Sequence, residues 1–291
     1  MELDRPVLVT GTPRAGKTVI AWMIALAPEF AYVGEPLLIW DFGLGARDDD
    51  RREAAEVTDR VRQHIVDACA ALVAETGKRR YVDALSYHAL RVPFVHRLMP
   101  EAKIVHVIRE PAAIIPEMLY GWTYRDTVGK VIARRRKGVK LHALPRHVLR
   151  FAKNYVQSRL RGKRSTWGPR VPGLAEFIET HSAAQVAAYQ WQQMIQIAMD
   201  DLEQVPRDRW LEVRYERLLK APRFEARRIA EFCEVEDIGR FIEAAEAMID
   251  PEFEFDKPVQ PTADEWKAIS KLISPLQRRL GYPVGAAEVR Q

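Results

Sequence analysis

The stretch VLVTGTPRAGKT, residues 7–18, decides the fold of this chain. It opens with an apolar, β-branched run, PVLVT at 6–10, which predicts a buried strand. A glycine, four further residues and then GKT give the spacing G-x-x-x-x-G-K-[ST] of a phosphate-binding loop, and a helix is expected at 17–26. In such a loop, backbone N–H groups and the positive end of the helix both attract phosphate. The stretch therefore predicts the start of a βαβ unit that binds a phosphorylated ligand.

Strand and helix patterns alternate along most of the remaining chain. Strands are expected at AYV (31–33), YVDAL (81–85), AKIVHVI (102–108) and RWLEVRY (209–215), and helices at 57–76, 90–99, 183–202 and 263–281. Capping boxes formed by Ser182 with Gln185, and by Thr262 with Glu265, mark two of the helix starts. Because strands separated by helices form parallel sheets, the expected fold class is α/β: a three-layer α/β/α P-loop-type domain with a central parallel sheet. Residues 1–291 are expected to form one such domain.

A basic stretch interrupts this alternation. Residues 127–175 hold 14 Lys and Arg and no Asp or Glu, and we interpret about 123–180 as a basic helical insertion. A local field of that sign attracts anions. Three interpretations stay open: the insertion covers the site and binds an anionic acceptor, it makes peripheral contact with an anionic membrane or nucleic acid, or it is a solvated helical face. Nucleic acid is not expected as a partner, because aromatic residues that could stack on bases are sparse there.

The composition is that of a globular protein, with 47% hydrophobic and 29% charged residues. The longest apolar run, VIAWMIALA at 19–27, is too short to span a bilayer, and the first residues do not resemble a signal peptide. A cytoplasmic location is therefore expected. Cys69 and Cys233 lie among apolar residues without metal-ligand spacing, so we expect buried free thiols and no metal site. The oligomeric state is left open.

The intact GKT raises the alternative of a P-loop kinase or NTPase. Such an enzyme needs a carboxylate at the end of a neighbouring buried strand to help hold Mg²⁺. The best candidate strand, KIVHVI, is followed instead by Arg109. An arginine at the carboxyl edge of a parallel strand suits a phosphate group of the ligand, so the kinase interpretation is weakened.

Several further segments, taken in order, resemble one family. They are TPRAGKT (12–18), VGEPLL (33–38), LRVPFVHRLMPEAKIVHVIREPAAII (90–115), WGPRVPG (167–173), QW (190–191), WLEVRYERLLKAP (210–222) and LGY (280–282). The chain resembles the P-loop sulfotransferases, particularly their bacterial-type branch. These enzymes take a sulfuryl group from 3′-phosphoadenosine 5′-phosphosulfate (PAPS).

The resemblance implies a donor site on particular residues. Arg14 falls where relatives place the cation that contacts the leaving phosphate. Ala15, Gly16, Lys17 and Thr18 would complete the 5′-phosphosulfate loop. Arg109 corresponds to the arginine that binds the 3′-phosphate, and Tyr215 to an aromatic residue near the adenine.

The resemblance also implies the catalytic residues Glu35, Arg14 and Lys17. Sulfuryl transfer to a hydroxyl needs a base for the acceptor proton and donors for the charge that develops on the leaving phosphate. Glu35, in GEP, falls where some bacterial members carry the carboxylate base, and His88 is the competing candidate. We expect transfer from PAPS, without a metal, to a hydroxyl (or amine) of a carbohydrate, lipid or small-molecule acceptor.

Two residues depart from the family pattern. Glu117 stands where relatives commonly have a serine that binds the same 3′-phosphate, so a carboxylate there would repel the donor unless Arg109 or an arginine of the insertion intervenes. Lys17 replaces the usual Ser or Thr after the loop glycine. In addition, Asp83-Ala84-Leu85 lacks the Lys-Thr that relatives often have before the following helix. Glu117 and this missing pair keep a second alternative open, a non-catalytic nucleotide-binding protein of the same fold.

Overall fold

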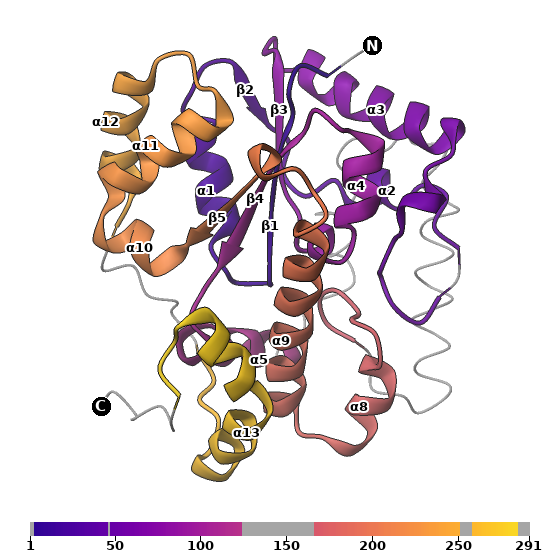
Figure 1. The fold of residues 1–291 in the computed structure, drawn as a ribbon, viewed down its shortest axis with the longest axis vertical. Helices are drawn as coiled ribbons and strands as arrows, with labels where there is room; N and C mark the ends of the chain where they lie inside the picture. Colours follow the sequence, from indigo (N-terminus) through magenta and orange to yellow (C-terminus); the bar gives the residue numbers. More distant parts are fainter. Residues whose placement is uncertain (1–2, 46, 124–165, 251–257, 285–291) are drawn as a thin grey trace.

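The computed structural model describes residues 3–45, 47–123, 166–250 and 258–284. Within these residues the centre is a five-stranded sheet with the strand order β2-β3-β1-β4-β5 (Figure 1). Its strands are β1 (Val7–Gly11), β2 (Phe30–Tyr32), β3 (Arg80–Ala84), β4 (Lys103–Ile108) and β5 (Trp210–Arg214). Every neighbouring pair of strands is parallel. The expected parallel sheet is confirmed.

Alternate residues of β1 supply the two sides of the core. Val7 and Val9 join one apolar cluster and Leu8 joins the other, because successive side chains of a strand point to opposite faces. The first cluster lies under α1 (Lys17–Ile24), α11 (Pro222–Cys233) and α12 (Ile238–Met248), and the second under α2 (Leu37–Trp40), α3 (Asp59–Ala74) and α4 (Val92–Leu98). Figure 1 shows α11 and α12 on one side of the sheet and α3 and α4 on the other. The expected α/β/α layering is confirmed.

A second group of helices gathers beyond the carboxyl ends of β1 and β4 (Figure 1). Its members are α5 (Pro111–Thr123), α8 (Leu174–Thr180), α9 (Ala183–Leu202) and α13 (Ala263–Leu280). The capping boxes expected at the starts of α9 and α13 are both formed. The longest of the four, α9, packs on α5 and α13 and reaches β1. This group therefore encloses the edge of the sheet at which the phosphate loop lies.

Residues 166–180 pack against this second group. Trp167 fills the space beside Gly121 in α5, where an added Cβ would come within 2.3 Å of the indole. Gln190 of α9 donates a hydrogen bond to the carbonyl oxygen of Trp167 at 3.0 Å. The end of the stretch expected as an insertion is thus anchored to the domain, while its greater part, 124–165, lies outside the described residues.

Cys69 and Cys233 are buried and free, as expected. Burial raises the pKa of both thiols, so they are unreactive at neutral pH. In the part of the chain that the structure describes, no helix has the length and apolar character to cross a bilayer.

Candidate functional site

The phosphate loop joins β1 to α1 by a tight turn. Gly11 has φ +144°, and a Cβ there would lie 2.3 Å from the carbonyl oxygen of Val107 in β4, so only glycine fits. Arg14 adopts φ +69°, an unfavourable conformation for a residue with a side chain, and Gly16 follows at φ +92°. Backbone strain of this kind is found at functional sites. The turn ends at the N-terminus of α1, where Gly16 offers no side-chain cap to the N–H groups of the first helical turn.

Lys17, the first residue of α1, is buried inside this loop. Only 6% of it is exposed, and its Nζ donates a hydrogen bond to the carbonyl oxygen of Thr12 at 2.7 Å. Burial lowers the pKa of Lys17 to about 8; the Glu35 carboxylate opposes this shift and the Arg14 guanidinium adds to it. The ammonium group is held by a single neutral carbonyl, so a phosphate in the loop would be a stronger partner.

Arg109 brings the end of β4 against the same loop. Its Nη1 donates to the carbonyl oxygen of Arg14 at 2.9 Å, and its Nη2 lies 2.8 Å from Glu117 Oε1. The guanidinium carbon is 5.1 Å from the centre of the Tyr215 ring, at the start of α10 (Tyr215–Lys220). Three segments that are distant in sequence therefore place Arg14, Arg109, Glu117 and Tyr215 in one cluster.

Glu117 is the anionic member of this cluster. Its side chain projects from α5 and is only 9% exposed. Burial raises the pKa of Glu117, and the neighbouring Arg109 and Arg14 oppose the shift. The carboxylate thus balances the charge of Arg109, the residue expected to bind the 3′-phosphate.

Glu35 follows β2 and lies near Lys17 at the start of α1. It is exposed and close enough to Lys17 and Tyr32 to raise the pKa of both. The pKa of Tyr32 rises to about 12, mainly through burial and also through Glu35, while a hydrogen bond with Thr18 opposes the rise. Four residues are therefore neighbours at the start of α1: Lys17, Thr18, Tyr32 and Glu35. Tyr32 was not among the residues expected at the site; the signal that could have found it is its position at the end of the short strand just before GEP.

A sequence model described as the sulfotransferase family matches residues 6–238, most of the chain. The chain belongs to this family. The protein is therefore a sulfotransferase enzyme, and the family to which it belongs uses PAPS as sulfuryl donor. Among curated proteins, none matches the chain significantly.

Solved structures share the fold of this sulfotransferase. The sulfotransferase domain from the curacin biosynthetic pathway aligns with a TM-score of 0.54 at 15% identity, over 98% of this chain and 100% of that one. The sulfotransferase STF9 from Mycobacterium avium aligns with a TM-score of 0.53 at 13% identity, over 98% of this chain and 79% of that one. The α/β fold of the family is thus found over nearly the full length of the chain.

The kinase alternative would need a carboxylate that is available to a metal near the loop. Beside β1 on the other side from β4, β3 carries Asp83, which is fully buried. Its Oδ2 is within hydrogen-bonding distance of three groups: Tyr81 Oη at 2.9 Å, Trp40 Nε1 at 3.0 Å and His88 Nε2 at 3.1 Å. Asp83 is therefore engaged in the core, which agrees with the family match and not with an NTPase. His88, the competing candidate for the base, is buried in the same cluster.

Gln190 positions a segment beside the loop of the sulfotransferase. It accepts a hydrogen bond from Trp122 at 3.3 Å and donates to the carbonyl oxygens of Trp167 and Pro169 at 3.0 and 2.6 Å. The segment thereby lies against the loop, since a Cβ added to Gly168 would be 3.4 Å from Pro13. QW at 190–191 was noted from the sequence, but no role was assigned to Gln190. The signal that could have found it is a polar side chain on the buried face of α9.

Arg170, from the basic stretch 127–175, is turned inward. It forms an ion pair with Asp50 at 2.7 Å, and the backbone N–H of Asp50 donates to the carbonyl oxygen of Arg170 at 2.9 Å. This arginine joins the loop before η1 (Ala54–Glu56) to the domain. It is therefore not available to an external anion.

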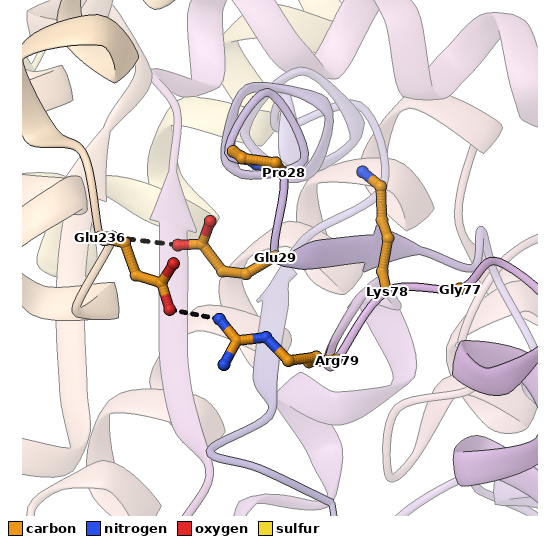
Figure 2. A pocket seen from close by; sticks show the side chains of 6 residues that line it. All are labelled: Pro28, Glu29, Gly77, Lys78, Arg79 and Glu236. Atoms are coloured by element: carbon orange, nitrogen blue, oxygen red, sulfur yellow. Dashed lines mark hydrogen bonds and ion pairs between the residues drawn. The ribbon is translucent and has the colours of Figure 1, made fainter.

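A separate hollow lies at the opposite edge of the sheet. Figure 2 shows its lining, which is Pro28, Glu29, Gly77, Lys78, Arg79 and Glu236. These residues precede β2 and β3 or follow α11, whereas the phosphate loop follows β1. Lys78 Nζ donates to the carbonyl oxygen of Phe30 at 2.7 Å, and Arg79 pairs with Glu236. The hollow is therefore not part of the donor site.

Proposed function

We propose that this sulfotransferase transfers a sulfuryl group from PAPS to a hydroxyl, or an amine, of a carbohydrate, lipid or small-molecule acceptor. The observation that carries the proposal is the contact between the phosphate loop and Arg109, whose guanidinium lies 2.9 Å from the carbonyl oxygen of Arg14. Two cationic positions on neighbouring strands suit a nucleotide with phosphate groups at both ends of its ribose.

The donor would lie along this line of residues. Gly16, Lys17 and Thr18, at the start of α1, together with Arg14 and Ala15, would bind the 5′-phosphosulfate. Arg109 would bind the 3′-phosphate. Tyr215, whose ring edge lies against Gly16 and whose ring centre is 5.1 Å from the Arg109 guanidinium carbon, would contact the adenine.

In the reaction, the acceptor oxygen forms a bond to sulfur as the bond between sulfur and the bridging phosphate oxygen breaks. The electron pair of the broken bond stays on the phosphate, where Lys17 and Arg14 stabilise the developing charge. The acceptor proton passes to Glu35, which lies near Lys17 at the start of α1. The products are the sulfated acceptor and adenosine 3′,5′-bisphosphate.

Isothermal titration calorimetry tests the donor site. We expect adenosine 3′,5′-bisphosphate to bind more tightly than AMP, and Arg109→Ala to abolish the difference, because only the bisphosphate carries a 3′-phosphate. If the wild-type enzyme bound both equally, and removing anionic groups around Arg109 did not change this, the assignment of Arg109 would be wrong.

Transfer of labelled sulfate from PAPS to a panel of hydroxyl and amine acceptors tests catalysis. Glu35→Gln should lower the rate by roughly 10²- to 10⁴-fold, the usual contribution of a general base. Glu75→Gln, a substitution of an exposed glutamate at the end of α3, is the matched control and should leave the rate unchanged. Equal rates for the two variants would remove Glu35 as the base.

The anionic acceptor, the membrane contact and the cytoplasmic location stay predictions. The first two depend on the basic stretch 127–175, most of which lies outside the described part of the chain. Flotation with phosphatidylcholine vesicles, with and without phosphatidylserine, tests the contact: binding that needs phosphatidylserine and declines with salt supports it.

A further inference from the structure

Arg109 is already paired with an anion of its own chain. Its Nη2 lies 2.8 Å from Glu117 Oε1, while its Nη1 donates to the Arg14 carbonyl oxygen at 2.9 Å. The ring of Tyr215 lies 5.1 Å from the guanidinium carbon. The arginine thus has its planar face against a ring and one amino group on a carboxylate.

The surroundings of Glu117 determine how firmly this pair is held. Among the described residues, the charged and titratable groups that face it are Arg109 after β4, Arg14 in the loop and Tyr215 at the start of α10. From α9, packed on α5, the neutral Trp191 donates to the carbonyl oxygen of Arg109 at 3.2 Å. Burial raises the pKa of Glu117 while both arginines oppose the rise. Protonation of this carboxyl is therefore easier than for an exposed glutamate.

A carboxylate and a phosphate group compete for the same guanidinium. Both accept parallel hydrogen bonds from arginine, and two such anions on one cation in a poorly solvated site repel each other. A 3′-phosphate that approaches Arg109 must displace the Glu117 carboxylate, or the carboxyl must take up a proton. Either event weakens binding relative to a site in which residue 117 is neutral.

We propose that Glu117 is a specificity-determining residue that competes with the donor's 3′-phosphate for Arg109, so that it sets how strongly this enzyme prefers nucleotides that carry the 3′-phosphate. The inference rests on the proposed function, in which Arg109 binds that phosphate. It has two consequences. Preference for the bisphosphate over AMP is smaller than Arg109 alone would provide, and it declines as pH rises and the carboxyl loses its proton.

Calorimetry with adenosine 3′,5′-bisphosphate and AMP, from pH 4.5 to 8, tests the proposal on the wild-type enzyme, Glu117→Gln and Glu117→Ser. At pH 7.5 both variants should bind the bisphosphate roughly ten- to a hundredfold more tightly, the range of a charged hydrogen bond. AMP affinity should change less than about twofold, because AMP brings no 3′-phosphate to Arg109. Glu231→Gln, at an exposed position on α11, is the matched control and should change neither affinity.

The pH dependence separates Glu117 from the ligand. The phosphate groups titrate in every experiment, so the slope for Glu117→Gln reports the ligand alone. A steeper loss of bisphosphate affinity with pH in the wild-type enzyme than in Glu117→Gln supports the competition. Parallel slopes would overturn it.

Other outcomes distinguish this inference from the function on which it rests. If both variants bound the bisphosphate no more tightly than the wild type, and bisphosphate still exceeded AMP, the proposed function would stand and the competition would be refuted. If AMP affinity declined in both variants, Glu117 would be a ribose ligand and not a competitor. If the bisphosphate never exceeded AMP, even in Glu117→Ser, the 3′-phosphate site itself would be absent. Thermal unfolding of each variant establishes that it is folded.

Discussion

Two buried polar clusters flank β1, and they differ in what holds their charges. Around Asp83, one carboxylate oxygen is shared by Trp40, Tyr81 and His88 from three elements, all within 3.1 Å. At the phosphate loop, counting only the described residues, the ammonium of Lys17 donates to one neutral carbonyl oxygen, and Arg109, which follows β4, pairs with one carboxylate.

The difference distinguishes buried polar groups that stabilise the fold from buried polar groups that can bind a ligand. A carboxylate oxygen that three groups of its own chain contact is stabilised where it is, although the second oxygen of Asp83 is buried without a hydrogen-bond partner among the described residues. A buried cation with a weak partner costs folding free energy but retains its capacity for a ligand. The first cluster therefore supports the fold, and the second is poised to bind anions.

The largest effect is expected from Asp83→Ala, which removes the common acceptor of three buried donors. We expect a loss of about 4 kcal/mol in the free energy of unfolding, because breaking a buried charged network leaves its partners unsatisfied. Urea denaturation measures this. Asp208→Ala, at a side chain that is 70% exposed, is the control and should cost little. A loss below about 1 kcal/mol would show that the cluster is not structural.

Lys17→Met should increase the free energy of unfolding, whereas Asp83→Ala should decrease it. Because burial lowers the pKa of Lys17 from 10.5 to about 8, holding its charge near neutral pH costs folding free energy at ~1.4 kcal/mol per pKa unit. Allowing for the lost hydrogen bond to Thr12, we expect the variant to be more stable by about 2 kcal/mol at pH 7. Bisphosphate affinity should decline by roughly a hundredfold, as expected when a charged hydrogen bond is lost.

The pH dependence of this difference follows from the same shift. Below pH 8 the lysine is protonated in both the folded and the unfolded chain, so the cost is present in full. Between about pH 8 and 10.5 the folded enzyme releases the proton while the unfolded chain keeps it, so the wild type gains stability relative to Lys17→Met. Urea denaturation at pH 7, 8 and 9.5 tests this. Lys220→Met, at an exposed position, should show no such change, and a constant gap between wild type and Lys17→Met would contradict the assignment.

Gln190→Ala tests the hydrogen bonds that the Gln190 side-chain amide makes beside the phosphate loop. It removes a buried amide that contacts Trp122, Trp167 and Pro169, so we expect a loss of about 2 kcal/mol by urea denaturation. Bisphosphate affinity should weaken by only about threefold, because the amide positions the segment against the loop and does not touch the ligand. The control is Gln196→Ala on the same helix, where the amide bonds only Asp200. Loss of affinity without loss of stability would make Gln190 a ligand contact.

Tyr32→Phe should have the smallest effect. The hydroxyl forms a hydrogen bond with Thr18, and the pKa of Tyr32 is raised to about 12, so the group stays protonated at any physiological pH. We expect a loss of less than about 1 kcal/mol in stability, no more than a few-fold loss in rate, and an unchanged pH–rate profile below pH 9. A profile that changed shape would place Tyr32 in the proton transfer.

Local patterns in the sequence were sufficient to predict the loop, the strands and the helix starts. The spacing of Gly11, Gly16 and Lys17, the β-branched run at 103–108 and the capping boxes each depend on residues close together in the chain. Such signals are independent of tertiary structure, and the structure agrees with them.

Contacts between segments that are distant in the sequence could not be predicted from such local patterns. The sharing of Asp83 by three elements, and the hold of Gln190 on the segment beside the loop, depend on which strands and helices become neighbours. The sequence predicted that Glu117 would repel the 3′-phosphate. The ion pair between Glu117 and Arg109 is known only from their distance of 2.8 Å in the structure. The same limit applies to residues 166–180, which were assigned to the basic insertion from the sequence. In the structure Trp167 packs against Gly121 of α5, and Gly168 lies beside Gln190 and Pro13.

The contact between Gly16 and Tyr215 has a consequence for anyone who redesigns this enzyme. A Cβ at residue 16 would lie 2.3 Å from the ring of Tyr215, so the first loop of the chain and the strand-to-helix junction after β5 cannot be mutated independently. A library that varies residue 215, the proposed adenine contact, also changes the packing against the phosphate loop. Donor base preference and sulfuryl transfer would then evolve together, as one trait carried by two distant positions.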